Sequence, residues 1–159
     1  MVFAIDPGSE KSAWVIFDEK MAPVKFGISK NRALIKLIRN IASAVGVKTL
    51  VIEIVKSYGN VMGDSVLQTV EWIGRFQEAF GPGKIVRLSR KEIVTNICGH
   101  ARAKDKNVRQ AVIDRFGGKE KALGSKKNPG SIYGAKKDIF SALAVGLTYF
   151  DSYSHEFLS

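Results

Sequence analysis

Three carboxylates lie where charged side chains are costly, each next to apolar sequence. Asp6 follows the apolar residues 1–5 and begins an Asp-Pro-Gly turn, and Glu53 lies within the run Leu-Val-Ile-Glu-Ile-Val of residues 50–55. Asp138 lies near the start of a segment, residues 136–153, that is apolar on two sides. Ionised carboxylates are costly to bury unless they are paired or bind a metal. Because oxygen ligands at the ends of elements suit Mg²⁺ or Mn²⁺, the three acids favour a metal-dependent centre.

Each carboxylate taken alone has a second interpretation. Asp6 can hydrogen-bond its own turn, as aspartate often does in turns of this composition. Asp138 can simply stabilise its helix, because a negative charge near the N-terminus interacts favourably with the helix dipole. Glu53 is harder to explain structurally, because no Lys or Arg lies within the same apolar run. The three acids together therefore favour one shared site.

The elements around these residues predict one α/β domain over residues 1–159. Short apolar runs bounded by turn residues predict five strands, at 1–5, 12–17, 23–28, 49–55 and 84–88. Helical periodicity predicts helices over 31–46, between 63 and 81, near 90–98, near 106–116 and over 136–153. This order predicts an antiparallel three-strand meander followed by parallel crossover units.

Positive charge is concentrated in one third of the chain. The 159 residues carry a formal net charge of +10, and residues 84–137 contain 15 Lys or Arg against 4 Asp or Glu. Solvated surfaces without a special partner mix both signs, so this segment predicts a face that binds a polyanion. Residues 117–134 are rich in Gly, Ser, Lys and Asn, a composition that predicts a mobile basic loop.

Composition excludes several other classes of protein. The longest apolar runs are far shorter than the ~20 residues that span a bilayer. The N-terminus has no basic start followed by a long apolar stretch, so no secretory signal is predicted. The single cysteine, Cys98, excludes an internal disulfide and a cysteine-rich zinc site. We therefore expect a soluble intracellular protein.

Four segments of the chain resemble the RuvC-type Holliday junction resolvases, particularly the compact phage-encoded versions. They are FAIDPGSEKSAWVIFD, LVIEIVKSYGN, GHARAKDKNVRQAVIDRFGG and KKDIFSALAVGLTYF, and they follow the family's order over nearly the whole chain. The resemblance implies a ribonuclease-H-like fold, with a mixed five-stranded sheet flanked by helices. It also implies a homodimer in the cytoplasm of a bacterial cell or a phage-infected host, with two Mg²⁺ or Mn²⁺ ions per active site.

The resemblance gives catalytic and metal-binding roles to the same three acids. Asp6 matches the family's first-strand aspartate, Glu53 its central-strand glutamate, and Asp138 the earlier acidic position on its last helix. The later position on that helix, usually aspartate in cellular resolvases, is Ser141 here. Ser141 and Asp105 are therefore candidate accessory ligands. In the resulting hypothesis Asp6 bridges two metal ions at the scissile phosphate, and Glu53 and Asp138 each bind one of them.

The predicted DNA contacts come from the basic segment and from one aromatic residue. Six basic residues are candidates for neutralising phosphates: Arg102, Lys104, Lys106, Arg109, Lys136 and Lys137. Tyr58 either stacks on bases at the crossover, as the resemblance implies, or packs against its own loop. Trp72 and Phe76 lie on the helix after the glutamate strand, where they are either dimer contacts or core residues.

The function expected from these features is that of a structure-specific endodeoxyribonuclease in DNA recombination and repair. It would resolve Holliday junctions or other branched DNA and leave 5′-phosphate and 3′-hydroxyl ends. Two alternatives stay open: a flap or replication-fork nuclease of broad specificity, and a non-catalytic protein that binds branched DNA. The serine at position 141 is the feature that favours the second alternative.

Overall fold

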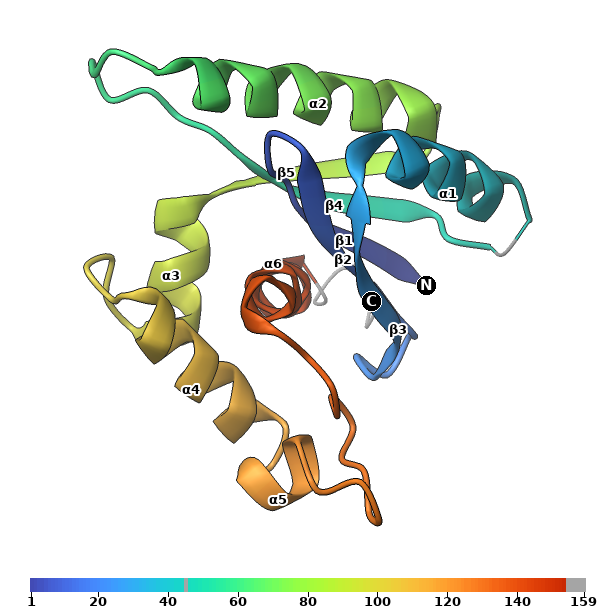
Figure 1. Cartoon of the computed structure of the whole chain (residues 1–159), viewed down its shortest axis with the longest axis vertical. Helices are drawn as coiled ribbons and strands as arrows, with labels where there is room; N and C mark the ends of the chain where they lie inside the picture. The colour runs from blue at the N-terminus through green and yellow to red at the C-terminus, as the bar shows by residue number, and fades with distance from the viewer. Residues whose placement is uncertain (45, 154–159) are drawn as a thin grey trace.

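A five-stranded mixed sheet lies at the centre of the computed structural model, which describes residues 1–44 and 46–153 (Figure 1). The strands are β1 (Val2–Asp6), β2 (Lys11–Phe17), β3 (Pro23–Lys30), β4 (Thr49–Ile54) and β5 (Lys84–Ser89). Their order in the sheet is β3-β2-β1-β4-β5. The first three strands are antiparallel neighbours, whereas β4 runs parallel to β1 and β5 runs parallel to β4. The predicted meander and parallel strands are confirmed, while the last six residues of the predicted domain, 154–159, lie outside the described part.

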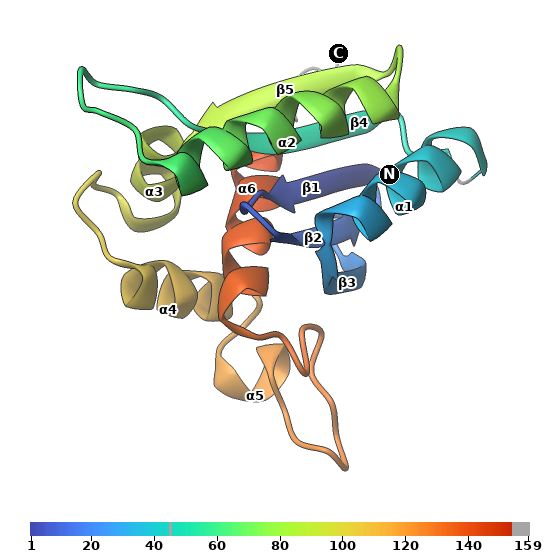
Figure 2. The same ribbon diagram turned by 45° about the horizontal axis from the view of Figure 1, so that its top comes forward.

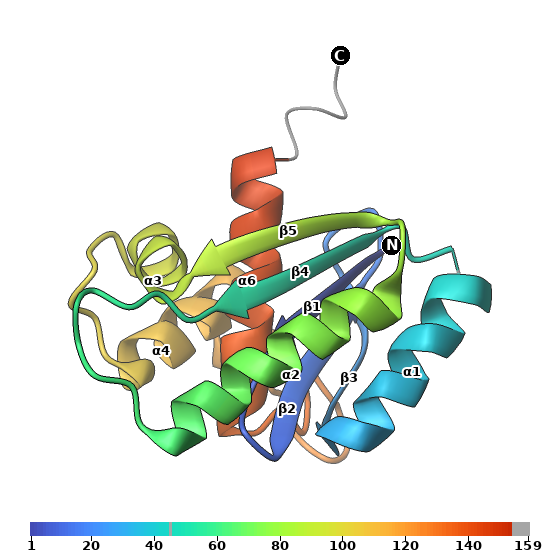
Figure 3. The same ribbon diagram turned by 90° about the horizontal axis from the view of Figure 1, so that it is seen from above.

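Helices cover both faces of this sheet (Figure 3). On one face lie α1 (Asn31–Ala44) and α2 (Asp64–Phe80), and α6 (Lys137–Tyr153) crosses the other. Side chains alternate along a strand, so each strand supplies both layers. Phe3 and Ile5 of β1 join the core cluster under α1 and α2, whereas Val2 and Ala4 join the cluster under α6.

Helix α6 lies very close to the sheet. Gly146 makes this approach possible, because a Cβ atom there would lie 2.1 Å from Cε2 of Phe17 on β2. Phe17 also meets Phe150 of the same helix edge to face, with ring centroids 5.6 Å apart. Although α6 is buried along most of its length, no helix in residues 1–44 and 46–153 is long and apolar enough to cross a membrane.

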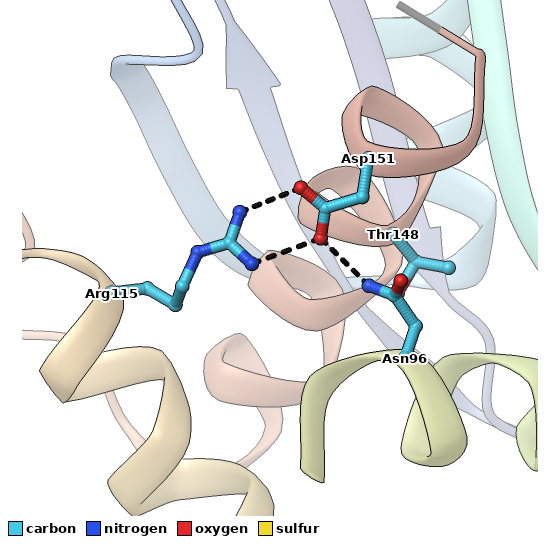
Figure 4. A network of polar contacts seen from close by, with 4 residues as sticks. All are labelled: Asn96, Arg115, Thr148 and Asp151. Atoms are coloured by element: carbon cyan, nitrogen blue, oxygen red, sulfur yellow. Dashed lines mark hydrogen bonds and ion pairs between the residues drawn. The ribbon is translucent and has the colours of Figure 1, made fainter. Parts of the chain in front are cut away.

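Two further helices, α3 (Arg90–Cys98) and α4 (Asp105–Arg115), pack against α6. A polar network joins all three (Figure 4). Arg115 donates two hydrogen bonds of 2.7 and 2.9 Å to the Asp151 carboxylate, and Asn96 Nδ2 donates one of 2.7 Å to the same group. Because Arg115 ends α4, this network helps to fix the position of the helix that begins at Asp105.

The segment 117–134, predicted as a loop, contains an additional element. Helix α5 (Lys119–Ala122) occupies its first part, and an antiparallel bridge between Gly124 and Pro129 closes a turn after it. Ala122 and Ile132 are fully buried and attach the segment to the core under α6. The segment is therefore more structured than its composition predicts, and its mobility stays a prediction.

Candidate active site

Asp6 is the last residue of β1, Glu53 is the last but one of the adjacent strand β4, and both face the same layer of the molecule. The residues just before them, Ile5 and Ile52, are partners in the parallel register of β1 and β4. Ala4, two residues before Asp6, belongs to the cluster under α6, as does the residue two before Glu53. Since side chains alternate along a strand, both carboxylates project towards the α6 side at the carboxyl edge of the sheet.

A buried network shapes the Asp-Pro-Gly turn that follows Asp6. The amide of Gly8 donates to Ser12 Oγ (3.1 Å), the Ser12 hydroxyl donates to Asn31 Oδ1 (2.7 Å), and Asn31 Nδ2 donates to the Gly8 carbonyl (2.8 Å). Gly8 has no room for a side chain, because a Cβ there would lie 2.3 Å from the carbonyl oxygen of Lys11. The turn is thus held by residues other than Asp6, which makes no side-chain hydrogen bond to any described residue.

Asp138 lies in the first turn of α6, on the exposed side of that helix. It lines a surface pocket together with Asp105 and Ser141, the two candidate accessory ligands. The pocket also contains three of the predicted phosphate contacts, namely Lys106, Arg109 and Lys137. The structure therefore brings the α6 acid, both accessory candidates and half of the predicted basic residues into one place.

The acids act on one another electrostatically. Burial, followed by the negative charges of Glu53, Asp138 and Asp105, raises the pKa of Asp6 to about 8, against the opposing effect of Arg90. Burial also raises the pKa of Glu53, again against the attraction of Arg90. Such increases are typical of carboxylates that share a partly desolvated site. The pKa of Asp6 is thus raised by each of the other three acids of the site, Glu53, Asp138 and Asp105.

Arg90 is a site residue that the local sequence patterns did not predict. Its Nη1 lies 3.8 Å from Glu53 Oε2, and its Nη2 donates a 2.6 Å hydrogen bond to Asp105 Oδ1. Ser89 caps α3 through a reciprocal capping box with Glu92, and this box sets Arg90 at the carboxyl edge of β5. The Ser-x-x-Glu pattern directly after a predicted strand was the signal available in the sequence.

The carboxylate oxygens of the site are suitable ligands for a hard divalent cation, but in the described residues they do not lie close enough together to form a ready metal site. Glu53 Oε2 is buried and accepts no hydrogen bond from any described residue, a costly state that a bound cation would relieve. Within residues 1–44 and 46–153, however, no three Asp, Glu, His or Cys side chains lie together as a metal site. Arg90 lies between Glu53 and Asp105 and contributes the positive charge there.

Tyr58 lines a second pocket, which Arg90 also lines. This pocket also contains Glu53, Lys56 and Lys91, and neither lysine was predicted as a site residue. Tyr58 is 67% exposed, so most of its ring is accessible to a ligand. Of the remaining predicted phosphate contacts, Arg102, Lys104 and Lys136 are exposed and lie outside the two pockets.

The two aromatic dimer candidates have different surroundings. Phe76 is fully buried in the core cluster under α1 and α2, which favours the core interpretation of this residue over the dimer contact. Trp72 is partly buried, stacks on Phe76 and carries the Arg75 guanidinium 4.2 Å above its ring. The exposed apolar side chains of α2 are instead Val66, Leu67 and Val70.

The fold matches solved structures of RuvC. The chain is similar to the Thermus thermophilus RuvC structure with a TM-score of 0.64 and 16% sequence identity, over 98% of this chain and 96% of that one. It is also similar to T. thermophilus RuvC in complex with a Holliday junction substrate, with a TM-score of 0.69 and 15% identity over 98% and 95% of the two chains. No protein-family model matches the sequence, and no curated protein matches it significantly. The chain therefore has the RuvC-like, ribonuclease-H-like fold that the sequence resemblance implies.

Proposed function

We propose that this protein is a structure-specific endonuclease that resolves Holliday junctions or other branched DNA by metal-dependent phosphodiester hydrolysis. One observation carries the proposal: Asp6 and Glu53 lie at the carboxyl ends of neighbouring strands, one at the last and one at the last but one position, and both face α6. The charges of Glu53 and Asp138 both raise the pKa of Asp6. In addition, one of the similar RuvC structures contains a Holliday junction. The products would carry 5′-phosphate and 3′-hydroxyl ends.

In this proposal the acidic side chains of the site bind the metal ions and the basic side chains bind the DNA. Asp6, Glu53 and Asp138 would bind two Mg²⁺ or Mn²⁺ ions, with Ser141 or Asp105 as accessory ligands. The bound ions would supply an activated water and stabilise the leaving oxygen. Lys106, Arg109 and Lys137 line the pocket that contains Asp138, and they would hold the phosphate backbone next to that carboxylate.

Cleavage of a synthetic four-way junction, with and without Mg²⁺ or Mn²⁺, tests the proposal. Wild type should cut only with metal, and Glu53→Gln should lower the rate by about 100-fold or more, because metal ions supply several kcal/mol of transition-state stabilisation. Glu53→Gln should still bind the junction. Glu19→Gln, which changes an exposed glutamate in the β2–β3 turn, is the matched control and should cut like wild type. Full activity of Glu53→Gln would refute the assignment.

A non-catalytic protein that binds branched DNA is the second candidate. Two observations favour it: no three acidic side chains among the described residues form a ready metal group, and Arg90 already supplies positive charge beside Glu53. Junction binding by wild type without cleavage in either metal would support this candidate. If cleavage occurs, a panel of junction, fork, flap and duplex substrates separates a resolvase from a flap or fork nuclease of broad specificity.

We further propose that the protein acts as a homodimer through α2. Val70 lies four residues after Val66 and three after Leu67, so these exposed apolar side chains flank one another on the helix surface, and Trp72 lies further along the same helix. Leu67→Asp should convert a dimer into a monomer in sedimentation velocity. A wild-type mass equal to that of the monomer at micromolar concentration would contradict the proposal.

A further inference from the structure

Four lysines project from the segment 117–134, which we call the lysine arm. They are Lys119, Lys121, Lys126 and Lys127, and the only acid within the segment is Glu120. All four side chains are exposed. None of the four forms an ion pair with a residue in the described part of the chain, unlike Arg90 and Arg115. The arm therefore presents uncompensated positive charge to solvent.

Backbone hydrogen bonds give the arm a defined course. The two sides of the arm are joined by bonds from Gly130 N to Leu123 O (3.0 Å) and from Ile132 N to Ala122 O (2.8 Å). Gly124 has a φ of +63°, and a Cβ on Gly130 would lie 2.3 Å from the carbonyl oxygen of Ala122. The close approach of the two sides thus requires glycine at these positions. These backbone hydrogen bonds define the course of the arm.

The arm extends the positive surface of the candidate active site. It connects α4, which carries Lys106 and Arg109, to α6, which begins at Lys137 next to Asp138. In Figures 1 and 2 α5 and the turn after it project beyond α4 and the start of α6, away from the sheet. A polyanion that contacts Lys106 and Lys137 can therefore continue along the arm.

The chemistry of the arm's tip selects among polyanionic partners. Residues 125–129 are Ser-Lys-Lys-Asn-Pro, and all five are exposed. A tip that inserts into a membrane would be expected to carry large apolar side chains, and a tip that contacts a protein would be expected to have an aromatic or aliphatic anchor. The exposed aromatic residue of the arm, Tyr133, lies outside this tip. Lysines with small polar neighbours instead suit the phosphates of a nucleic-acid backbone, which dominate sequence-independent binding.

We propose that the lysine arm is a separate DNA-binding site that contacts the phosphate backbone of one duplex arm of the branched substrate, away from the crossover. The inference rests on the proposed function, and it adds a binding surface to the site. These contacts would position the substrate without reading its sequence. The arm would raise affinity for substrates whose duplex arms are long enough to reach it, and it would leave the chemistry at Asp6 and Glu53 unchanged.

The test compares Lys126→Gln/Lys127→Gln with Lys36→Gln/Arg39→Gln. The control pair lies exposed on α1, on the opposite face of the sheet, and removes the same charge. Binding to long-armed and short-armed four-way junctions is measured by fluorescence anisotropy in EDTA over a range of salt. The arm variant should bind the long-armed junction about threefold to tenfold more weakly, and its salt slope should fall by about 1–2, because each neutralised phosphate contributes about 0.9.

The short-armed junction and the control variant give further expected results. On short-armed junctions the arm variant should match wild type, and on both substrates the control should match wild type. The rate of single-turnover cleavage at saturating protein should be unchanged. Equal binding of wild type and the arm variant at every salt concentration would overturn the inference, and so would equal losses on long and short arms. If wild type binds but does not cut, the proposed function fails, while the binding data still decide on the arm.

Discussion

Arg90 joins the two pockets of the candidate active site through its contact with Asp105. The guanidinium lines the pocket that contains Glu53 and Tyr58, and its 2.6 Å hydrogen bond reaches Asp105, which lines the pocket that contains Asp138. Its other terminal nitrogen lies 3.8 Å from Glu53. The cationic side chain therefore lies between the two groups of acids that a metal-dependent nuclease would have to bring together.

The position of Arg90 predicts an effect on cation affinity. Arg90→Gln should increase Mn²⁺ affinity of the DNA-free protein by several-fold, because a positive charge that competes for Glu53 and Asp105 is removed. A difference of ~1 kcal/mol corresponds to about fivefold in affinity. Isothermal titration calorimetry measures the change, and Arg75→Gln on α2 serves as the control arginine variant. Weaker binding in Arg90→Gln would show that the guanidinium helps to position the ligands.

Asp6 predicts how the stability of the metal-free protein depends on pH. Its folded-state pKa of about 8 lies above the ordinary value of 3.8. The stability that this difference contributes is complete below about pH 4 and is lost as the pH rises through 8, because the folded state then contains an unfavourable charge. Asp6→Asn avoids that charge, so in EDTA it should be more stable than wild type at pH 8.

The size of this effect can be measured by urea unfolding in EDTA. One pKa unit corresponds to about 1.4 kcal/mol, and we expect Asp6→Asn to gain at least about 2 kcal/mol at pH 8 and almost nothing near pH 4. The same variant should bind junctions but not cut them. A constant difference in stability across this pH range would mean that Asp6 is not the group that titrates.

Tyr58 predicts a defect that is specific to branched DNA. Tyr58→Ala should leave duplex binding intact but reduce the opening of the crossover, because base–aromatic stacking contributes ~1–3 kcal/mol per base. A 2-aminopurine base placed at the crossover reports the unstacking. Tyr58→Phe keeps the ring and should behave like wild type. An unchanged 2-aminopurine signal in Tyr58→Ala would remove this residue from the site.

The pKa of Asp151 is shifted downwards, so we expect its contribution to stability to depend on pH in the opposite sense to that of Asp6. Burial raises its pKa, but hydrogen bonds from Arg115 and Asn96 outweigh that effect and lower the pKa overall. The resulting stability is present above the ordinary aspartate pKa and is lost as the pH falls through the folded-state value. Because the pair is partly exposed, Asp151→Asn should cost only about 0.5–1 kcal/mol at pH 7.

Thermal unfolding at several pH values tests this second contribution. The difference between wild type and Asp151→Asn should shrink below about pH 4, and Glu78→Gln, an exposed position on α2, should show no such trend. A cost that persists unchanged in acid would assign the effect to packing of α3 and α4 on α6, with no part for the ion pair.

Much of the fold and part of the site can be predicted from local sequence patterns. Strand alternation and turn residues predicted the five strands and their mixed order, because both signals act over a few neighbouring residues. Asp6 and Glu53 stood out for the same reason, as acids in apolar strands. The same patterns could not decide whether Phe76 is a core residue or a dimer contact, because helical spacing does not show which partner covers a given face of the helix.

Local sequence patterns identify Asp6 and Glu53 as acids in buried strands, the concentration of positive charge, and the order of strands and helices, but they grouped Asp138 with the buried acids although it is exposed on α6. Three features became visible only in the folded chain: Arg90 lies between Glu53 and Asp105, Ser12 and Asn31 hold the turn after Asp6, and the glycine-rich segment forms an arm. The difference lies in how far apart along the chain the interacting residues are. Periodicity, capping and burial cost are properties of neighbouring residues, whereas these contacts join residues far apart in the chain and form only when the packed elements meet.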